Sequence, residues 1–462
     1  MSTIHAYLTS VRPVLTSGIP ILAGDDLMRY DIPDGFRIYE NLASGVLLRP
    51  RPDVAIDAER NLYAYLVLRG IRPLLDADLP IRVDAAAITS VFEEHLLFDA
   101  YGKRGWNTGK AIFTEQVAFY TSRGLPVEFA LPAFPCKTTN PEKASSKLPD
   151  GAEYEALANL QAFCDGVRQI YSPGCYINIV SDGHVFSDCQ GTDDIVVHAY
   201  NRHLQEMLTN ICAGTTKETA ASAPSTDPAI RFFNLGQLLQ PDSQARCLAA
   251  KVPKAGKVKH PVQTQISGID DENRALMLGL FAPPETFYRD LVKGQPEHPI
   301  TALYRGFSRF MYEDLVLGSA SSSKNQRKRA AEEVAFTMIQ RNQTYSRMVE
   351  SVLPRHVRLS IHAHDNAGPK FAVRVMPWHI RHAESVDVLM DAGNKLGEDA
   401  WDARGTGHIP TPWHNTLVEV ETAHGRQMFL CRQSVIKQAL ERGFRGAYVN
   451  HERGARYIIQ KA

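Results

Sequence analysis

Three side chains able to do chemistry alternate with apolar residues in the segment 357–363: Arg358, Ser360 and His362. The alternation has the period of a β-strand, so the guanidinium, the hydroxyl and the imidazole would share one face. Arginine binds phosphate or carboxylate groups through paired hydrogen bonds, and histidine transfers protons near neutral pH. We predict that this face binds an anionic substrate and exchanges protons with it, although a solvated face of an edge strand would show the same pattern.

Two lysines lie in a proline-rich loop, residues 131–143, directly after residues 124–130, which alternate and predict a β-strand. Proline fixes the backbone, so the loop would hold its polar groups in place. Ligands of open α/β sheets bind beyond the carboxyl ends of the strands. We therefore predict that Lys137 and Lys143 bind an anion. An ordinary surface loop has the same composition.

The tetrapeptide Ser181-Asp-Gly-His184 follows a strand predicted over residues 175–180. Its Asp182 could bind a cationic amine or orient a histidine, and Gly183 is expected to adopt a positive φ in a tight turn. Asp-Gly is also one of the commonest sequences of hairpin turns. Spacing alone favours the hairpin turn over a functional site.

His414 and Asn415 follow a rigid Pro-Trp step in the segment 411–415. A histidine beside an asparagine can act as a general base with an orienting partner, and a buried histidine of structural importance fits the sequence equally well. Arg305 and Asp314 could line a pocket, although an ion pair on a helix surface is the simpler explanation.

Neither a metal nor a dinucleotide cofactor is predicted. His362, His364 and Asp365 have the residue types of a non-haem iron site, but the carboxylate lies at the wrong spacing. The chain contains no convincing strand–GxGxxG–helix unit and no P-loop. We expect neither metal ligands nor a bound nicotinamide.

The elements that would position these residues follow from hydrophobic periodicity. Helices are predicted over residues 86–98, 154–170, 193–209 and 323–353. Residues 371–376 are predicted to form the antiparallel hairpin partner of the strand 357–363, joined by a turn at residues 365–368. The order of strand, functional loop and helix is typical of βαβ units and predicts an α/β fold.

Composition restricts the classes of partner. The formal net charge of the 462 residues is zero, whereas proteins that bind nucleic acid are usually more basic. Seven cysteines without a CxxC pair or zinc-like spacing indicate reduced thiols. We see no signal peptide and no apolar run near the roughly 20 residues that span a bilayer. We expect a cytoplasmic protein with no nucleic-acid or membrane partner.

Residues 125–143 resemble the signature of the pyoverdine/dityrosine biosynthesis family, the isocyanide (isonitrile) synthases. Further segments match that family in the same order, and together they make a specific resemblance over residues 90 to 430. These segments are residues 181–188, 324–330, 357–362, 368–371 and 411–415.

The resemblance implies a Rossmann-like α/β fold and a reaction between an L-amino acid and ribulose 5-phosphate, with the sugar phosphate as co-substrate and no cofactor. The amine would condense with the C2 ketone, and one sugar carbon would remain on nitrogen as the isocyanide. We predict the following roles from the side-chain chemistry of the matched segments. Lys137, Lys143 and Arg358 bind phosphate or carboxylate, Asp182 binds the ammonium, His362 and His414 transfer protons, and Ser360, Asn415 and Arg305 contact substrate.

The resemblance also suggests how the chain is organised. We expect an N-terminal extension of unknown role over residues 1–85, a catalytic domain over 86–430 and a segment packing on it over 431–462. A flexible insertion is expected near 213–228 and a basic loop near 251–260. The extension and the insertions are more similar to the fungal branch, and a stand-alone synthase with separate tailoring enzymes is expected.

Two other activities compete with the isocyanide synthase. The dityrosine branch of the family is associated with N-formyl tyrosine, which is an isocyanide plus water. A metal-dependent oxygenase is the less favoured alternative. The matched segments do not indicate which amino-acid side chain is recognised.

Overall fold

The computed structural model describes thirteen parts of the chain. These are residues 36–42, 45–50, 83–98, 104–218, 228–239, 264–282, 285–314, 323–353, 355–362, 366–368, 370–390, 410–422 and 425–461. Most of the predicted N-terminal extension, the basic loop at 251–260 and residues 219–227 of the insertion lie outside these parts. Within the extension, β1 (Phe36–Leu42) and β2 (Gly45–Pro50) form an antiparallel pair.

The main sheet has five parallel strands in the order β5-β4-β3-β6-β7. The strands are β3 (Val127–Pro132), β4 (Cys175–Val180), β5 (Ile230–Phe233), β6 (Val357–Ser360) and β7 (Lys370–Ala372). Numbered by their order along the chain, the strands lie in the order 3-2-1-4-5. This is a doubly wound sheet, in which successive strands are added on one side of β3 and then, from β6, on the other side. The predicted Rossmann-like α/β class is therefore confirmed.

Helices cover both faces of this sheet, which explains why its strands are runs of apolar residues. On one face Phe129 and Ile177 pack against helices α3, α4, α5 and α7. On the other face Ala130 and Val180 belong to a second core formed with α6, α8 and α10–α13. The helices of the first face are α3 (Val83–His95), α4 (Arg104–Thr121), α5 (Gly151–Ile170) and α7 (Asp194–Glu218).

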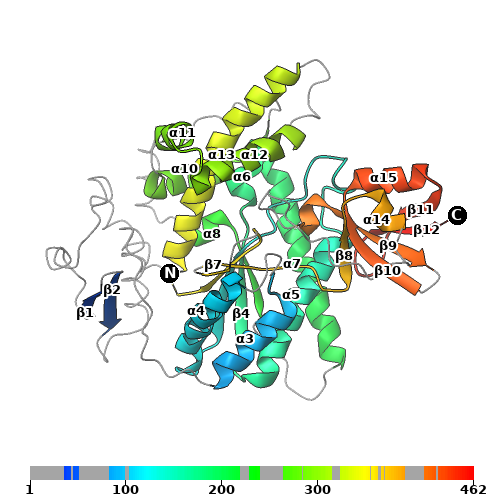
Figure 1. Ribbon diagram of the computed structural model, residues 1–462. Helices are drawn as coiled ribbons and strands as arrows, with labels where there is room; N and C mark the ends of the chain where they lie inside the picture. The colour runs from blue at the N-terminus through cyan, green and yellow to red at the C-terminus, as the bar shows by residue number, and fades with distance from the viewer. Residues whose placement is uncertain are drawn as a thin grey trace.

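The second face carries helices that gather on one side of the molecule, as the green to yellow ribbons of Figure 1 show. They are α6 (Gly183–Gln190), α8 (Leu235–Leu239), α10 (Gly268–Phe281), α11 (Glu285–Gly294), α12 (Pro299–Asp314) and α13 (Lys324–Val352). Helix α13 begins with a capping box in which Ser323 and Gln326 bond each other's backbone N–H groups. The predicted long helix over 323–353 is thereby confirmed.

A second five-stranded sheet lies at the right of Figure 1 and packs on a smaller core of its own. Its order is β11-β12-β9-β10-β8, and α14 (Val386–Met390) and α15 (Gln433–Glu441) pack beside it. The strands are β8 (Ile380–Ala383), β9 (Thr416–Thr422), β10 (Gly425–Cys431), β11 (Phe444–Val449) and β12 (Arg456–Lys461). The expected boundary between the catalytic domain and the C-terminal segment, at residues 430 and 431, falls inside β10. Residues on both sides of it belong to the same sheet.

The predicted hairpin between residues 357–363 and 371–376 is wrong. β6 and β7 pair in parallel, with Arg358 opposite Lys370 and Ser360 opposite Ala372. Asn366 in the connection has a φ of 53° and donates to the carbonyl of Phe98, which takes the chain away from β6 before it returns. In the described parts of the chain, no helix has the length and apolar character needed to cross a membrane.

Gly183 does not have the expected positive φ, because it is the first residue of α6 rather than part of a hairpin turn. Glycine is required there for space. A Cβ at this position would lie 2.1 Å from the carbonyl oxygen of Pro135 and 2.5 Å from a methyl of Val197. The close approach of α6 to the loop after β3 therefore depends on the missing side chain.

Replacing Gly183 by alanine is expected to lower the free energy of unfolding by about 1–3 kcal/mol, as overpacking of a filled interior does. Gly268→Ala is the matched control, since Gly268 is also the first residue of its helix and has open space around its Cα. Denaturant unfolding of both variants tests the difference. Equal stability of the two variants would contradict the steric explanation.

Candidate active site

A cavity of about 480 Å³ opens where the carboxyl ends of β3, β4 and β6 meet α12, α13 and the segment 410–415. This is the position at which a doubly wound sheet binds its ligands, because the strand order reverses there and the loops on either side leave a crevice. Five of the predicted site residues line the cavity: Lys143, Asp182, His362, His414 and Asn415. The described structure therefore brings together residues that are far apart in the sequence.

Asp182 directly follows β4 and occupies the N-cap position of α6, but its side chain does not cap the helix. Its Oδ1 atom is buried and has no hydrogen-bond partner among the described residues. Burial raises the pKa of this carboxyl to about 7, against the opposing charge of Arg358. An unpaired buried acceptor at a cavity wall is costly for the free protein, and a cationic ligand would satisfy it.

Lys143 lines the cavity with its ammonium fixed in place. Its Nζ lies 2.8 Å from Oδ1 of Asp314 and 3.3 Å from Oε2 of Glu313, and 4.6 Å above the ring of Phe310. Asp314 thus pairs with Lys143, whereas the sequence suggested Arg305 as its partner. The lysine is thus held by two carboxylates and an aromatic face.

Two further arginines that the sequence did not single out line the cavity, Arg309 and Arg432. Arg432 lies 3.2 Å from Glu313. Arg305, which was predicted to contact substrate, is exposed and does not line the cavity. Arg305 lies one helical turn before Arg309 on α12. The prediction thus named an arginine of the correct helix, but the arginine that lines the cavity is Arg309.

His362 and His414 lie on the cavity wall from different elements. The backbone N–H of His362 donates to the hydroxyl of Ser360 across 3.2 Å. Nδ1 of His414 lies 3.3 Å from the hydroxyl of Thr411, and its ring meets the ring of Phe310 edge to face at 5.1 Å. Both imidazoles are partly exposed, as proton transfer to a bound molecule requires.

Asn415 does not orient His414 as predicted, because its amide donates to the carbonyl of Thr411 at 2.9 Å and closes the 3-10 turn η3 (Pro412–His414). His382 and Glu384 also line the cavity, from the end of β8 in the second sheet. Nothing in the sequence linked these two residues to the site, because only the packing of the two sheets brings them there.

Arg358 and Ser360 do not line the cavity. The strand β6 ends at Ser360, so the polar face of the predicted strand stops before His362. Nη1 of Arg358 donates to the carbonyl of Leu359, and burial lowers the pKa of the guanidinium while Tyr345, Glu350 and Asp182 raise it. Arg358 therefore lowers the pKa of Asp182 through its charge and does not form part of the cavity wall.

Lys137 also lies outside the cavity lining and is fully buried. Its Nζ lies 2.7 Å from Oε2 of Glu153 and 3.1 Å from Oδ1 of Asp150, and it donates to the carbonyl of Pro412 at 2.9 Å. Burial opposes its charge, but the two carboxylates raise the pKa of Lys137. With no free hydrogen-bonding direction toward the cavity, this lysine holds the η3 turn in place and is not placed to bind phosphate.

The fold and cavity together define an α/β protein with a candidate ligand cavity at the switch point of a doubly wound sheet. The model of the pyoverdine/dityrosine biosynthesis protein family matches residues 117–443, which is more than half of the chain. The chain belongs to this family, and the family recognised from the sequence is confirmed.

Relatives of the chain carry different names. The spore wall maturation protein DIT1 of Saccharomyces cerevisiae is 37% identical over 366 residues, covering 77% of this chain and 64% of the yeast protein. The chain therefore spans less than two thirds of that relative. The L-tyrosine isonitrile synthase of Pseudomonas aeruginosa is 30% identical over 306 residues, covering 66% of this chain and 74% of the synthase.

A solved structure supports the fold. The crystal structure of the PvcA protein from Pseudomonas aeruginosa superimposes with a TM-score of 0.58 and 24% identity, over 81% of this chain and 100% of that chain. The parallel sheet and its flanking helices are thus shared at the level of architecture.

Proposed function

We propose that the protein is an isocyanide synthase that converts the amine of an L-amino acid to an isocyanide with ribulose 5-phosphate as the carbon donor. The observation that carries the proposal is the cavity at the switch point, where a carboxylate with one buried, unpaired oxygen lies among cations and imidazoles. Membership of a family that includes an L-tyrosine isonitrile synthase supports the same chemistry.

In this proposal Asp182 accepts the ammonium of the amino acid, since its Oδ1 is the unsatisfied acceptor of the cavity. Lys143, Arg309 and Arg432 attract the phosphate and carboxylate of the two substrates. His362 and His414 move protons while the imine forms, phosphate leaves and the carbon–carbon bond breaks. The reaction needs no cofactor beyond the sugar phosphate.

The arginine assignment is testable with a matched pair on one helix. Arg309→Gln is expected to raise the KM for ribulose 5-phosphate by about 10-fold, because a hydrogen bond to a charged group contributes about 1.5–3 kcal/mol and Arg309 shares the anion with other cations. Arg305→Gln removes the same charge one turn away from the cavity and is expected to leave KM unchanged. Equal KM values for the two variants would remove Arg309 from the phosphate site.

The proposed activity is tested by anaerobic incubation of the protein with ribulose 5-phosphate and a mixture of L-amino acids, followed by mass spectrometry. A product with one carbon more and two hydrogens fewer than one amino acid establishes the synthase and identifies its substrate. If folded protein yields no product derived from an amino acid, the proposal fails for these substrates.

An N-formyl amino acid is the second candidate product, favoured by the 37% identity to the yeast spore wall protein. It would appear as a gain of one carbon and one oxygen. Sampling at early times separates the cases, because a formyl product that arises by hydration of an isocyanide follows it in time. In either case separate enzymes would process the released product further.

A further inference from the structure

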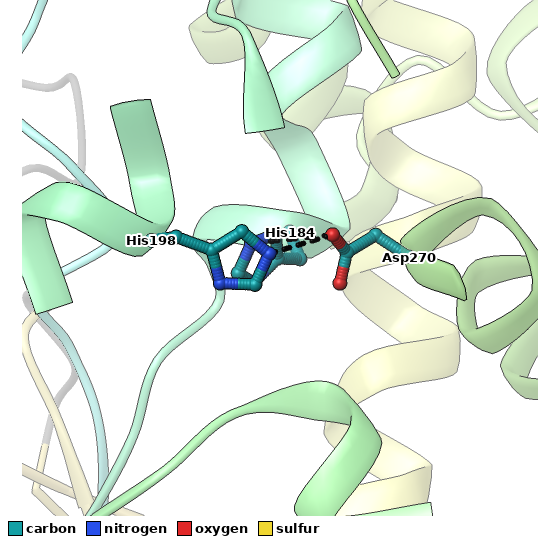
Figure 2. Close-up of side chains that lie close together, drawn as sticks. All are labelled: His184, His198 and Asp270. Carbon is teal, nitrogen blue, oxygen red and sulfur yellow. Dashed lines mark hydrogen bonds and ion pairs between the residues drawn. The ribbon is translucent and has the colours of Figure 1, made fainter. Parts of the chain in front are cut away.

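A cluster of two imidazoles and a carboxylate lies outside the cavity, where three helices meet. Figure 2 shows His184 from α6, His198 from α7 and Asp270 from α10 pointing toward one another. Oδ2 of Asp270 lies 2.9 Å from Nε2 of His198 and 3.7 Å from Nε2 of His184. The two imidazole rings are 4.3 Å apart between centroids. None of the three residues lines the cavity described above.

His184 has an unused ligand atom in the middle of this cluster. Its side chain is 1% exposed, and its Nε2 has no hydrogen-bond partner among the described residues. A neutral imidazole is the form that binds metal ions.

Asp270 is a buried carboxylate without an arginine or lysine partner in the described parts of the chain, where its ion-pair partners are the two imidazoles. The nearby Arg274 is engaged elsewhere, because it donates to Asp194 and to the carbonyl of His184. Burying a carboxylate is costly unless a cation compensates it. The cluster therefore joins a buried carboxylate that has only imidazole partners among the described residues to a buried nitrogen without a hydrogen-bond partner.

We propose that His184, His198 and Asp270 bind a divalent first-row transition-metal ion such as Zn²⁺, with water completing the coordination. The three ligand atoms lie within 4.8 Å of one another. Donors bound at about 2.1 Å to one ion lie about 3.0–3.4 Å apart, so the cluster needs only side-chain adjustments to close on the ion. Imidazole donors favour such ions over Mg²⁺ or Ca²⁺.

The cluster is open to solvent on one side, and the helices that carry its ligands are held together by other contacts. The side chain of His198 is 43% exposed, which leaves a path for the ion and for water. The segment before α10 is tied to α7 independently of the cluster, since Asp194 accepts from the backbone N–H of Ser267 and pairs with Arg274. The ion would join three helices and fix the first turn of α6, which begins one residue after Asp182.

The test uses the full chain without a polyhistidine tag, stripped with a chelator and titrated with Co²⁺ and with Zn²⁺. Wild-type protein is expected to bind one Co²⁺ with the visible d–d bands of nitrogen and oxygen ligands, and Zn²⁺ is expected to raise its Tm. His198→Gln and Asp270→Asn are expected to weaken binding by more than about 100-fold, since even changes outside the ligand shell cost about 10- to 100-fold.

His203→Gln is the matched control, because His203 lies on the same helix and its Nδ1 pairs with the carbonyl of Ala199. This variant is expected to keep the Co²⁺ spectrum and the Tm response. His198 is the more exposed imidazole of the cluster, so replacing it is expected to leave the fold intact. Loss of binding in this variant then reports on the metal ligand and not on misfolding. Absence of stoichiometric binding by the wild-type protein, or binding that persists in both ligand variants, would overturn the proposal.

Discussion

The Asp182→Asn protein is expected to lose about 10- to 150-fold in turnover, which corresponds to one charge-assisted hydrogen bond of about 1.5–3 kcal/mol. Asparagine keeps the shape of the side chain but removes the negative charge that we propose to hold the substrate ammonium. Because Oδ1 of Asp182 has no hydrogen-bond partner in the described structure, burying the ionised carboxyl is costly for the native fold, and the charge of Arg358 offsets only part of that cost. The free energy of unfolding is therefore expected to stay the same or to increase.

The measurement is kcat and KM for the amino acid, together with thermal unfolding of the same samples. Asp165→Asn serves as a control, since Asp165 is a partly buried carboxyl on α5 that accepts a hydrogen bond from Gln161 and does not line the cavity. It is expected to leave turnover unchanged. Wild-type turnover of the Asp182 variant would exclude that carboxylate from the reaction.

Lys137→Met is expected to lower the free energy of unfolding by about 3–5 kcal/mol, as breaking a buried ion pair does. Methionine matches the length of lysine but leaves Asp150 and Glu153 as buried carboxylates without their cation. The η3 turn also loses the bond to the carbonyl of Pro412. Turnover is expected to fall with the disordered turn, while the KM for ribulose 5-phosphate in the folded fraction stays near the wild-type value.

Lys147→Met is the matched control, because Lys147 is an exposed lysine of the following loop. The double variant Lys137→Met with Glu153→Gln is expected to recover part of the lost stability, because residues in direct contact are coupled. A stable Lys137→Met protein with a strongly raised KM for the sugar phosphate would instead support the phosphate role predicted from the sequence.

Much of the fold could be predicted because periodicity is local. The strand at residues 175–180 coincides with β4, and the helices at 154–170 and 323–353 correspond to α5 and α13 with shifts of a few residues. The loops after β4 and β6, the two strands that flank β3, leave at the same edge of the parallel sheet, which is why Asp182 and His362 share a cavity. This inference needs only the strand assignment.

What failed depends on contacts between distant segments. Lys137 was predicted to bind phosphate because it lies in a proline-rich loop after a strand, and its partners Asp150 and Glu153 form the capping box of α5. Only the tertiary fold places that helix end around the ammonium. Likewise, the alternation predicted a polar face that continues to His362, whereas β6 ends at Ser360, whose hydroxyl accepts from the backbone N–H of His362.

The cavity has walls from two sheets, and the second sheet contributes residues both to the main core and to a smaller core of its own. Asp182 and His362 come from the parallel sheet, whereas His382 and Glu384 come from the end of β8. Substitutions at His382 or Glu384 are expected to reshape this wall while leaving the loops after β4 and β6 in place. We therefore expect substitutions in the second sheet to alter substrate preference with the residues that we propose to react unchanged.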